Sequence, residues 1–507
     1  MKISALATEL SARGFRCSRV GSEDPDVEGV TCDSRSATHG DLFVALPGRK
    51  TDGGKFVADA LRAGAQAVAC SPDIALPAGA AGIVVDDLAR ACGQIAAVVH
   101  GDPARRLTLV GITGTNGKTS CTYLLESMWA AARQPAGVIG TVSIRWPDHE
   151  EKAAMTTPDA PLLQAKLRAM VEAGCTCAAI EVSSHALSQY RVEGCEFHGA
   201  IFTNLTRDHL DYHGDEETYF AAKAALFLDH LCSDGVAVLN ADDPYAMRLA
   251  NRLPGKRIRT FSIRQDAGAW AEPFEVRCGL DGLHGRIRLG DEIVRLETVL
   301  IGLPNLANVL AAAALARSLG VPLEAVENGI RARPPVPGRL ERVGRSTPVV
   351  LVDYAHTPDA LERTLATTRE MTRGRLIVVF GCGGDRDRGK RPIMGRAASA
   401  IADVSVLTSD NPRSEDPLHI LRAIEEGVAR HASRRSAQEL HGSGARGYTV
   451  EPDRERAIAA ALALAQPDDV VVIAGKGHED YQEVAGVRRA FDDREVVRRL
   501  RAARGES

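Results

Sequence analysis

A strand that runs into a glycine-rich loop and then into a helix is the feature that most constrains this chain of 507 residues. Residues 107–113 are largely apolar, and an apolar helical face with Tyr123, Leu124 and Leu125 follows the loop. Such a junction directs backbone N–H groups at phosphate oxygens, while a lysine meets the β and γ phosphates and a threonine hydroxyl reaches Mg²⁺. We therefore predict a nucleotide triphosphate site at Gly114, Thr115, Asn116, Gly117, Lys118 and Thr119. The alternative is a helix N-terminus without a ligand.

Length and composition limit the classes of protein to which the chain can belong. The length exceeds what one hydrophobic core usually supports, so we expect three domains. The net charge of −4 leaves no basic excess for nucleic acid. No run of about 18 apolar residues and no signal peptide is visible, so we expect a cytoplasmic protein without membrane insertion. We also expect a monomer. The 11 cysteines predict reduced, mostly buried thiols, with Cys175 and Cys177 alternating along a strand.

Two breaks predict three domains, at residues 1–103, 104–337 and 338–507. The first break is the HGDP sequence at residues 100–103, and the second is the PPVPG sequence at residues 334–338. In the middle domain, apolar strand-like runs alternate with helical stretches, which predicts a mostly parallel sheet. The last domain repeats this alternation and predicts a doubly wound α/β fold. Its expected strands lie near residues 349–352, 376–380, 404–407 and 470–474.

Polar residues follow two expected strands of the middle domain. Glu181 follows a strand that ends at residue 180, and His209 lies in the polar segment after a strand that ends at residue 202. Because Mg²⁺ prefers oxygen ligands, we predict Glu181 and Thr119 as magnesium ligands, with His209 near a second metal. Glu181 could instead be a carboxylate at a helix N-terminus, where the helix dipole stabilises it, and His209 could be structural. From its chemistry alone, we predict that Lys223 is a surface residue whose aliphatic stem covers apolar neighbours.

Four loops of the last domain are rich in glycine, arginine and carboxylates, at residues 353–356, 381–392, 410–413 and 475–479. Each loop follows an apolar strand, so we expect all four at one edge of the sheet. Arginine suits a carboxylate through paired hydrogen bonds, and glutamate suits an ammonium. The loops therefore predict a zwitterionic substrate, with surface ion pairing as the alternative.

Together these motifs resemble the Mur ligases, the ATP-dependent amino-acid ligases of peptidoglycan precursor synthesis. The resemblance covers essentially the whole chain, from residues 33–35 to the loops of the last domain. It implies a small N-terminal α/β domain that binds UDP, a central P-loop ATPase-like domain and a C-terminal Rossmann-like domain. The DNPR sequence at residues 410–413 resembles that of members that add meso-diaminopimelate to UDP-N-acetylmuramoyl-L-alanyl-D-glutamate through an acyl phosphate.

The resemblance also implies roles for individual residues, with Lys118, Glu181, His209 and Lys223 as the catalytic ones. It overrides the surface interpretation of Lys223, which matches a lysine that the family carbamylates. Its predicted ligand sets are Ser34 and Arg35 for the uridine nucleotide; Thr156, Thr157, Ser183, Gln189 and Arg191 for the muramoyl dipeptide; Asn305, Arg339, Asp353 and His356 for ATP; Thr119, Glu181, His209 and carbamylated Lys223 for Mg²⁺; and Arg391, Asp410, Asn411, Pro412, Arg413, Gly475 and Glu479 for meso-diaminopimelate.

Arg413 is the residue that we predict to set specificity. Meso-diaminopimelate differs from lysine by a second carboxylate. Lysine would leave a guanidinium at this position unpaired, so the site would discriminate against lysine. Lysine-adding relatives carry a different residue at this position. Two other functions remain open, a folylpolyglutamate-type or other Mur-like ligase and a P-loop switch whose nucleotide state controls partner binding.

Overall fold

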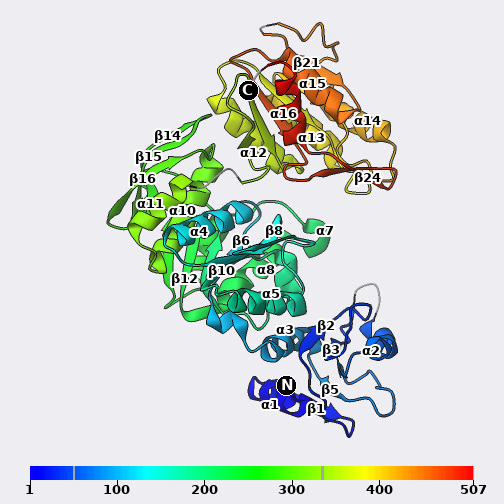
Figure 1. Ribbon diagram of the computed structural model, residues 1–507. Helices are drawn as coiled ribbons and strands as arrows, with labels where there is room; N and C mark the ends of the chain where they lie inside the picture. Colours follow the sequence, from blue (N-terminus) through cyan, green and yellow to red (C-terminus); the bar gives the residue numbers. More distant parts are fainter. Residues whose placement is uncertain (49–51, 333–335, 443, 506–507) are drawn as a thin grey trace. The chain divides into compact units, whose positions relative to one another are not determined.

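The computed structural model describes residues 1–48, 52–332, 336–442 and 444–505 (Figure 1). The chain divides into two compact units. The first contains Met1–Phe274, Ile287–Val294 and Ala307–Ile330, and the second contains Glu275–Arg286, Arg295–Leu306 and Arg331–Ser507. The break predicted at residues 334–338 lies partly outside the described residues, and the three domain boundaries stay predictions.

The first unit begins with a five-stranded sheet in the order β1-β5-β4-β3-β2. Only β1 is antiparallel to its neighbour. Helices α1 and α3 contribute to one hydrophobic core of this sheet, and α2 contributes to a second. This is the small α/β region that the resemblance implies at the N-terminus. Its elements are α1 (Ile3–Ala12), β1 (Cys17–Val20), β2 (Gly29–Thr31), β3 (Asp41–Val44), η1 (Gly53–Phe56), α2 (Val57–Ala63), β4 (Ala67–Cys70), β5 (Gly82–Val85) and α3 (Leu88–Val99).

A mostly parallel sheet of 11 strands follows, and eight neighbouring strands of it are in the order β13-β12-β11-β6-β10-β7-β8-β9. Pairing is parallel from β13 to β7 and antiparallel at β8 and β9. The mostly parallel sheet predicted for this region is confirmed. Its strands are β6 (Thr108–Thr113), β7 (Ala136–Ile139), β8 (Ser143–Trp146), β9 (His149–Lys152), β10 (Cys177–Glu181), β11 (Phe197–Phe202), β12 (Leu231–Asn240) and β13 (Arg257–Phe261).

Helices connect these strands, as parallel pairing requires. They are η2 (Pro103–Arg106), α4 (Lys118–Ala131), α5 (Ala160–Glu172), α6 (Ser184–Ser188), α7 (Leu210–His213), α8 (Glu216–Leu228) and α9 (Pro244–Ala250). The next elements are β14 (Ala271–Gly279), β15 (Gly282–Leu289), β16 (Glu292–Thr298), α10 (Leu303–Ser318) and α11 (Leu323–Ala332), and their residues are divided between the two units.

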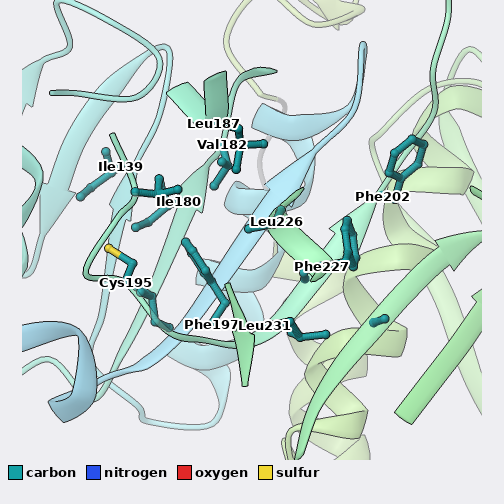
Figure 2. Close-up of a cluster of buried hydrophobic side chains, with 14 of the residues drawn as sticks. Ile139, Ile180, Val182, Leu187, Cys195, Phe197, Phe202, Leu226, Phe227 and Leu231 are labelled. Carbon is teal, nitrogen blue, oxygen red and sulfur yellow. The ribbon is translucent and has the colours of Figure 1, made fainter. Parts of the chain in front are cut away.

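The buried core of the central sheet fixes where its polar residues emerge. Figure 2 shows part of this core, including Ile180 of β10, Phe197 and Phe202 of β11 and Phe227 of α8. In the parallel register Glu181 pairs with Ile112, and Phe202 pairs with Thr113. The ends of β6, β10 and β11 therefore lie at one edge, where the phosphate loop begins.

The second unit contains a six-stranded sheet in the order β17-β18-β22-β19-β20-β21. All pairs are parallel except β17 with β18. Helices α12, α13 and α14 pack on one face and α15 and α16 on the other, which confirms the doubly wound fold. The elements are β17 (Glu341–Arg342), β18 (Val349–Asp353), α12 (Pro358–Met371), β19 (Leu376–Phe380), α13 (Lys390–Ile401), β20 (Val404–Leu407), α14 (Pro417–Val428), β21 (Gly447–Val450), α15 (Arg454–Leu464), β22 (Val470–Ala474) and α16 (Asp493–Ala502).

Several features differ from the expectations or add to them. The sequence did not predict β21 or the ribbon of β23 (Tyr481–Val484) with β24 (Val487–Ala490), because none of these strands is a long, fully buried apolar run. The strand predicted to carry both Cys175 and Cys177 begins at Cys177, so Cys175 precedes it. All 11 cysteines are free and most are buried, as expected. Among the described residues, no helix is long and apolar enough to cross a membrane.

Candidate nucleotide and amino-acid sites

The predicted phosphate loop joins β6 to α4, and its two glycines cannot be replaced without strain. Gly114 has φ +141°, and a Cβ there would lie 1.9 Å from Oγ1 of Thr203. Gly117 has φ +90°, and a Cβ there would lie 2.4 Å from Oδ1 of Asn308. The ammonium of Lys118 donates to the carbonyl oxygens of Gly114 at 2.7 Å and Thr115 at 2.9 Å. The loop is therefore closely packed, with its lysine folded over it.

Glu181 is 1% exposed and lies beside this loop. Its Oε2 accepts hydrogen bonds from Oγ1 of Thr119 at 3.0 Å and Oγ1 of Thr141 at 2.9 Å. Glu181 is the last residue of β10 and does not cap the next helix, because Ser183 caps α6 by accepting from the amide of Ala186. Two of the predicted magnesium ligands thus lie together. Thr141 was missed, although its position just after a short apolar run and Gly140 was a usable signal.

Lys223 on α8 is 1% exposed, so its interpretation as a surface residue is wrong. Its Nζ lies 4.4 Å from the centroid of the Tyr219 ring. Burial, and then the positive charge of Lys118, hold the pKa of Lys223 well below its ordinary value. A buried amine that gives up its proton readily is an unusual group in this part of the sheet.

His209 precedes α7 with a left-handed φ of 55°, and its Nε2 lies 3.5 Å from Oδ2 of Asp208. Burial is the main cause that lowers the pKa of His209, and the charges of Lys118 and Lys223 contribute. The four residues predicted as catalytic therefore all lie near the phosphate loop. Among the described residues, no group of three or more His, Cys, Asp or Glu side chains could hold a metal by itself.

Most of the residues predicted to bind the muramoyl dipeptide form one connected group next to Glu181. The hydroxyl of Thr157 donates to the carbonyl oxygen of Glu181 at 2.7 Å and accepts from the amide of Ser183 at 3.1 Å. Arg191 donates to the carbonyl oxygen of Thr157 at 2.8 Å and to Oε1 of Gln189 at 2.7 Å. The hydroxyls of Thr156 and Thr141 lie 3.1 Å apart.

Ser34 and Arg35, predicted to lie near the uridine nucleotide, are in a separate loop after β2. There the guanidinium of Arg35 pairs with Oδ2 of Asp33 at 2.7 Å. The side chain of Arg35 is exposed, and Ser34 is half-buried.

The residues predicted to contact ATP from the last part of the chain belong to the second unit. Asp353 ends β18, and its carboxylate accepts from the amides of Leu340 at 2.7 Å and Ala355 at 2.9 Å. Burial raises the pKa of Asp353. The guanidinium of Arg339 lies 4.9 Å from the Tyr354 ring centroid. Asp353 thus holds the backbone beside Arg339.

His356 and Asn305 have local partners in the same unit. Nδ1 of His356 lies 3.0 Å from the carbonyl oxygen of Tyr354, and burial lowers the pKa of His356. The side-chain amide of Asn305 donates to the carbonyl oxygen of Ile301 at 2.9 Å. The phosphate loop belongs to the first unit. That both units contribute to one ATP site therefore stays a prediction.

The residues predicted to bind the amino acid lie at the carboxyl ends of β19, β20 and β22. Arg391 is 3% exposed and donates two hydrogen bonds to Glu415, at 2.8 and 3.1 Å. This pairing lowers the pKa of Glu415 to about 2. The Nε of Arg391 is buried without a hydrogen-bond partner among the described residues. Because Arg391 is buried, the alternative of a surface ion pair does not hold for it.

The loop of residues 410–413 is tied to its neighbours by several hydrogen bonds. Arg413 has φ 55°, and its guanidinium donates to the carbonyl oxygen of Gly384 at 2.6 Å. Nδ2 of Asn411 donates to Oε2 of Glu479 at 2.8 Å, and its Oδ1 accepts from the amide of Glu483 at 3.0 Å.

Other residues complete this site. Oδ1 of Asp410 is buried without a hydrogen-bond partner among the described residues. The backbone of Pro412 and Gly475 packs tightly against its neighbours. A Cβ on Gly384 would lie 1.9 Å from the Pro412 carbonyl oxygen, and a Cβ on Gly475 would lie 3.3 Å from Oδ2 of Asp410. Sequence reasoning missed Lys476 and Glu415, although each stands inside or just after a motif that it did identify.

Comparisons with known proteins show which family the chain belongs to. Three family models match the chain, described as the Mur ligase family catalytic domain at residues 26–100, the Mur ligase middle domain at residues 112–316 and the Mur ligase glutamate ligase domain at residues 338–477.

Among curated proteins, the UDP-N-acetylmuramoyl-L-alanyl-D-glutamate–2,6-diaminopimelate ligase of Thermosynechococcus vestitus is 47% identical over 93% of each chain. The protein of the same name from Geobacter metallireducens is 44% identical over 94% of each chain.

One solved structure has the same name as these curated relatives, and others share the fold. A structure of a UDP-N-acetylmuramoyl-L-alanyl-D-glutamate–2,6-diaminopimelate ligase has a TM-score of 0.69 and 35% identity, and the match covers 95% of this chain and 96% of that one. The Mycobacterium tuberculosis folylpolyglutamate synthase, complexed with ADP and AMPPCP, shares the fold with a TM-score of 0.60 and 20% identity over 76% of this chain and 91% of that one. On the strength of the family models and the curated relatives, this chain belongs to the Mur ligase family.

Proposed function

We propose that this protein is an ATP-dependent ligase that joins meso-2,6-diaminopimelate to the D-glutamate γ-carboxylate of UDP-N-acetylmuramoyl-L-alanyl-D-glutamate. The observation that carries the proposal is the grouping of Arg391, Asn411, Arg413 and Glu479 at one edge of the second unit's sheet. This edge offers a guanidinium for a carboxylate and a carboxylate for an ammonium, which are the groups of this amino acid. The names of the relatives support the same substrates.

The first chemical step activates a carboxylate. The γ-carboxylate of D-glutamate is anionic and has no good leaving group, so it first attacks the γ-phosphate of ATP and forms an acyl phosphate with release of ADP. The backbone amides of residues 114–119 and the ammonium of Lys118 would stabilise the charge that spreads over the transferred phosphoryl group.

Magnesium fits the side chains beside the phosphate loop. The buried carboxylate of Glu181 and the hydroxyl of Thr119 are oxygen donors that lie 3.0 Å apart, and Mg²⁺ prefers oxygen ligands. Bound there, Mg²⁺ would neutralise phosphate charge. We infer that Thr119, Glu181, His209 and a carbamate on Lys223 would hold the metal.

The environment of Lys223 supports the carbamate. Only a neutral amine attacks CO₂, and the lowered pKa of Lys223 favours that form. The carbamate would replace an amine, whose protonated form Lys118 repels, with an anion that Lys118 attracts.

The second chemical step forms the amide. The amine at the L-centre of diaminopimelate attacks the acyl carbon, and phosphate leaves. Arg413 would pair with the carboxylate of the far centre and Glu479 with the far ammonium. A reaction in the cytoplasm by a monomer stays a prediction.

An amino-acid panel tests this proposal. The protein, ATP, Mg²⁺ and the muramoyl dipeptide are incubated with meso-diaminopimelate, L-lysine or D-glutamate, and phosphate and amide product are measured. We expect product with meso-diaminopimelate and little with the other two. Product with D-glutamate alone would favour a folylpolyglutamate-type ligase. Slow ATP hydrolysis at a rate that does not depend on the amino acid added would favour the P-loop switch.

A further inference from the structure

Lys476 is a fully buried lysine in the loop that follows β22. Its side chain is 0% exposed. A buried ammonium is costly unless it is paired and hydrogen-bonded. The position of its partners therefore indicates what its charge does.

Every acceptor near this ammonium belongs to the predicted amino-acid site. Nζ of Lys476 lies 3.2 Å from Oδ1 of Asn411, 3.2 Å from Oε2 of Glu479 and 3.8 Å from Oδ1 of Asp410. On another side, the ring centroid of Tyr481 lies 5.4 Å away. One buried charge thus joins the 410–413 loop to the 475–479 loop.

The hydrogen bonds use one oxygen of Glu479 and leave the other available. Oε2 accepts from both Lys476 and Asn411. No described residue donates to Oε1. Asn411 cannot turn freely, because its own Oδ1 accepts from Lys476 and from the amide of Glu483. The carboxylate of Glu479 is therefore held in one orientation.

Lys476 alone does not neutralise the two carboxylates that it faces. Asp410 and Glu479 are two carboxylates against one ammonium, and the nearby buried Arg454 is already paired with Asp493 at 2.7 Å. Oε1 of Glu479 can therefore take a substrate ammonium.

We propose that Lys476 is a positioning residue that orients Glu479, so that Oε1 receives the ammonium at the far centre of meso-diaminopimelate. On the proposed function, on which this inference rests, the attacking amine must be unprotonated while the far amine stays charged. A fixed carboxylate then distinguishes the far end of the substrate from the reacting end. Without Lys476, the carboxylate of Glu479 could rotate and the selection for the far ammonium would weaken.

The test compares meso-diaminopimelate with L-2-aminopimelate, which keeps both carboxylates and the reacting amine but lacks the far amine. Wild type, Lys476→Met and Lys476→Arg are assayed for kcat and KM with each amino acid and with ATP. Arg375→Met is the control, because Arg375 is also buried and paired, with Asp469 at 2.8 Å, but lies before β19 at the opposite end of the sheet.

We expect Lys476→Met to raise the KM for meso-diaminopimelate at least about tenfold, as loss of a buried charged hydrogen bond should. The preference for meso-diaminopimelate over L-2-aminopimelate should fall by a similar factor. The KM for ATP should change less than about twofold. Arg375→Met should lower the melting temperature without changing the preference.

Lys476→Arg keeps the charge, but its planar fork does not match the ammonium geometry. If Lys476→Met does not fold, the arginine variant decides the question, and its preference should also fall. An unchanged preference in a folded variant, or equal increases in the KM of every substrate, would overturn the proposal. If wild type forms no product with meso-diaminopimelate, the proposed function fails instead.

Discussion

At the scale of single residues, the burial of Lys223 is the most demanding feature of the first unit. The side chain is fully enclosed, and its pKa is held well below the ordinary value by burial and by Lys118. Hydrophobic packing would be better served by leucine or methionine at this position, because a buried amine loses hydration. A chemical role after modification accounts for the lysine.

We expect Lys223→Ala to lose about a hundredfold or more of the ligase activity, because a charged group beside the transferred phosphate would be missing. Short carboxylic acids such as acetate should restore part of it by occupying the space that the side chain leaves. Activity is measured as ADP release at increasing acetate concentration.

Lys256→Ala is the control, because Lys256 also belongs to the first unit but is only half-buried and donates to the carbonyl oxygens of Leu231 and Cys232. It should keep wild-type activity and show no response to acetate. Full activity of Lys223→Ala without acetate would contradict a role for the carbamate.

Arg413 carries the prediction on specificity. Its guanidinium is oriented by the carbonyl oxygen of Gly384 and has no ion pair among the described residues, so it can take a substrate carboxylate. We expect Arg413→Ala to lower kcat/KM for meso-diaminopimelate about a hundredfold, because a charged hydrogen bond is lost. The loss is measured against L-lysine in the same assay, and ATP binding should persist.

Arg446→Ala is the control for Arg413, since Arg446 is exposed and pairs with Asp403 at 3.0 Å before β20, at the opposite end of the sheet. It should leave both amino acids unaffected. An Arg413→Ala enzyme that keeps its preference over lysine would rule out this residue as the reader of the far carboxylate.

At the scale of elements, α6 and α7 bring several rings together. The ring of His185 on α6 lies 4.1 Å from that of Tyr212, 4.8 Å from that of His209 and 5.6 Å from that of His213. Burial, and then the charges of His209, His213 and Arg191, lower the pKa of His185 to about 4. The packed α6–α7 segment therefore favours the neutral ring.

The lowered pKa of His185 predicts that acid weakens this region. Between about pH 6.5 and 4 the unfolded chain binds a proton at this histidine and the folded chain does not, so stability falls as the pH falls through that window. Wild type should lose about 2 °C more in melting temperature than His185→Asn between pH 7 and pH 5.

Replacement of the exposed His441 by asparagine provides the comparison for general effects of acid. This variant should follow the wild-type curve. Equal losses in wild type and His185→Asn would show that His185 titrates normally in the folded protein.

At the scale of the whole molecule, the six-stranded sheet of the second unit has its own cores on both faces. Residues 338–507 contain every strand of this sheet. Residues outside this range also contact the sheet's cores, since Ile301 and Leu280 pack against one of them and the carbonyl oxygen of Leu280 accepts from Arg342 at 3.1 Å.

We therefore expect a fragment of residues 338–507 to fold alone but with lower stability, by about 3 kcal/mol for the loss of Ile301. A cooperative melt followed by far-ultraviolet circular dichroism would support the predicted boundary. A fragment of residues 295–507 is the control and should melt at a higher temperature. A fragment 338–507 without a cooperative transition would place the boundary elsewhere.

Local sequence was sufficient for much of the fold. Buried parallel strands are short apolar runs, and the predicted strands near residues 349–352 and 376–380 appear as β18 and β19. The ribbon of β23 and β24 could not be found in this way, because it is held by contacts to residues 411 and 413 and not by an apolar face of its own.

The sequence by itself determined the family, the parallel α/β architecture and the residue types at each strand end, since these depend on periodicity and on motifs that are continuous in the chain. Only the tertiary structure decided that Lys223 is buried, that Arg391 is held by Glu415 and that Lys476 joins Asn411 to Glu479. Burial and charge pairing depend on which distant segments meet, and the ends of parallel strands bring together residues that are far apart in sequence.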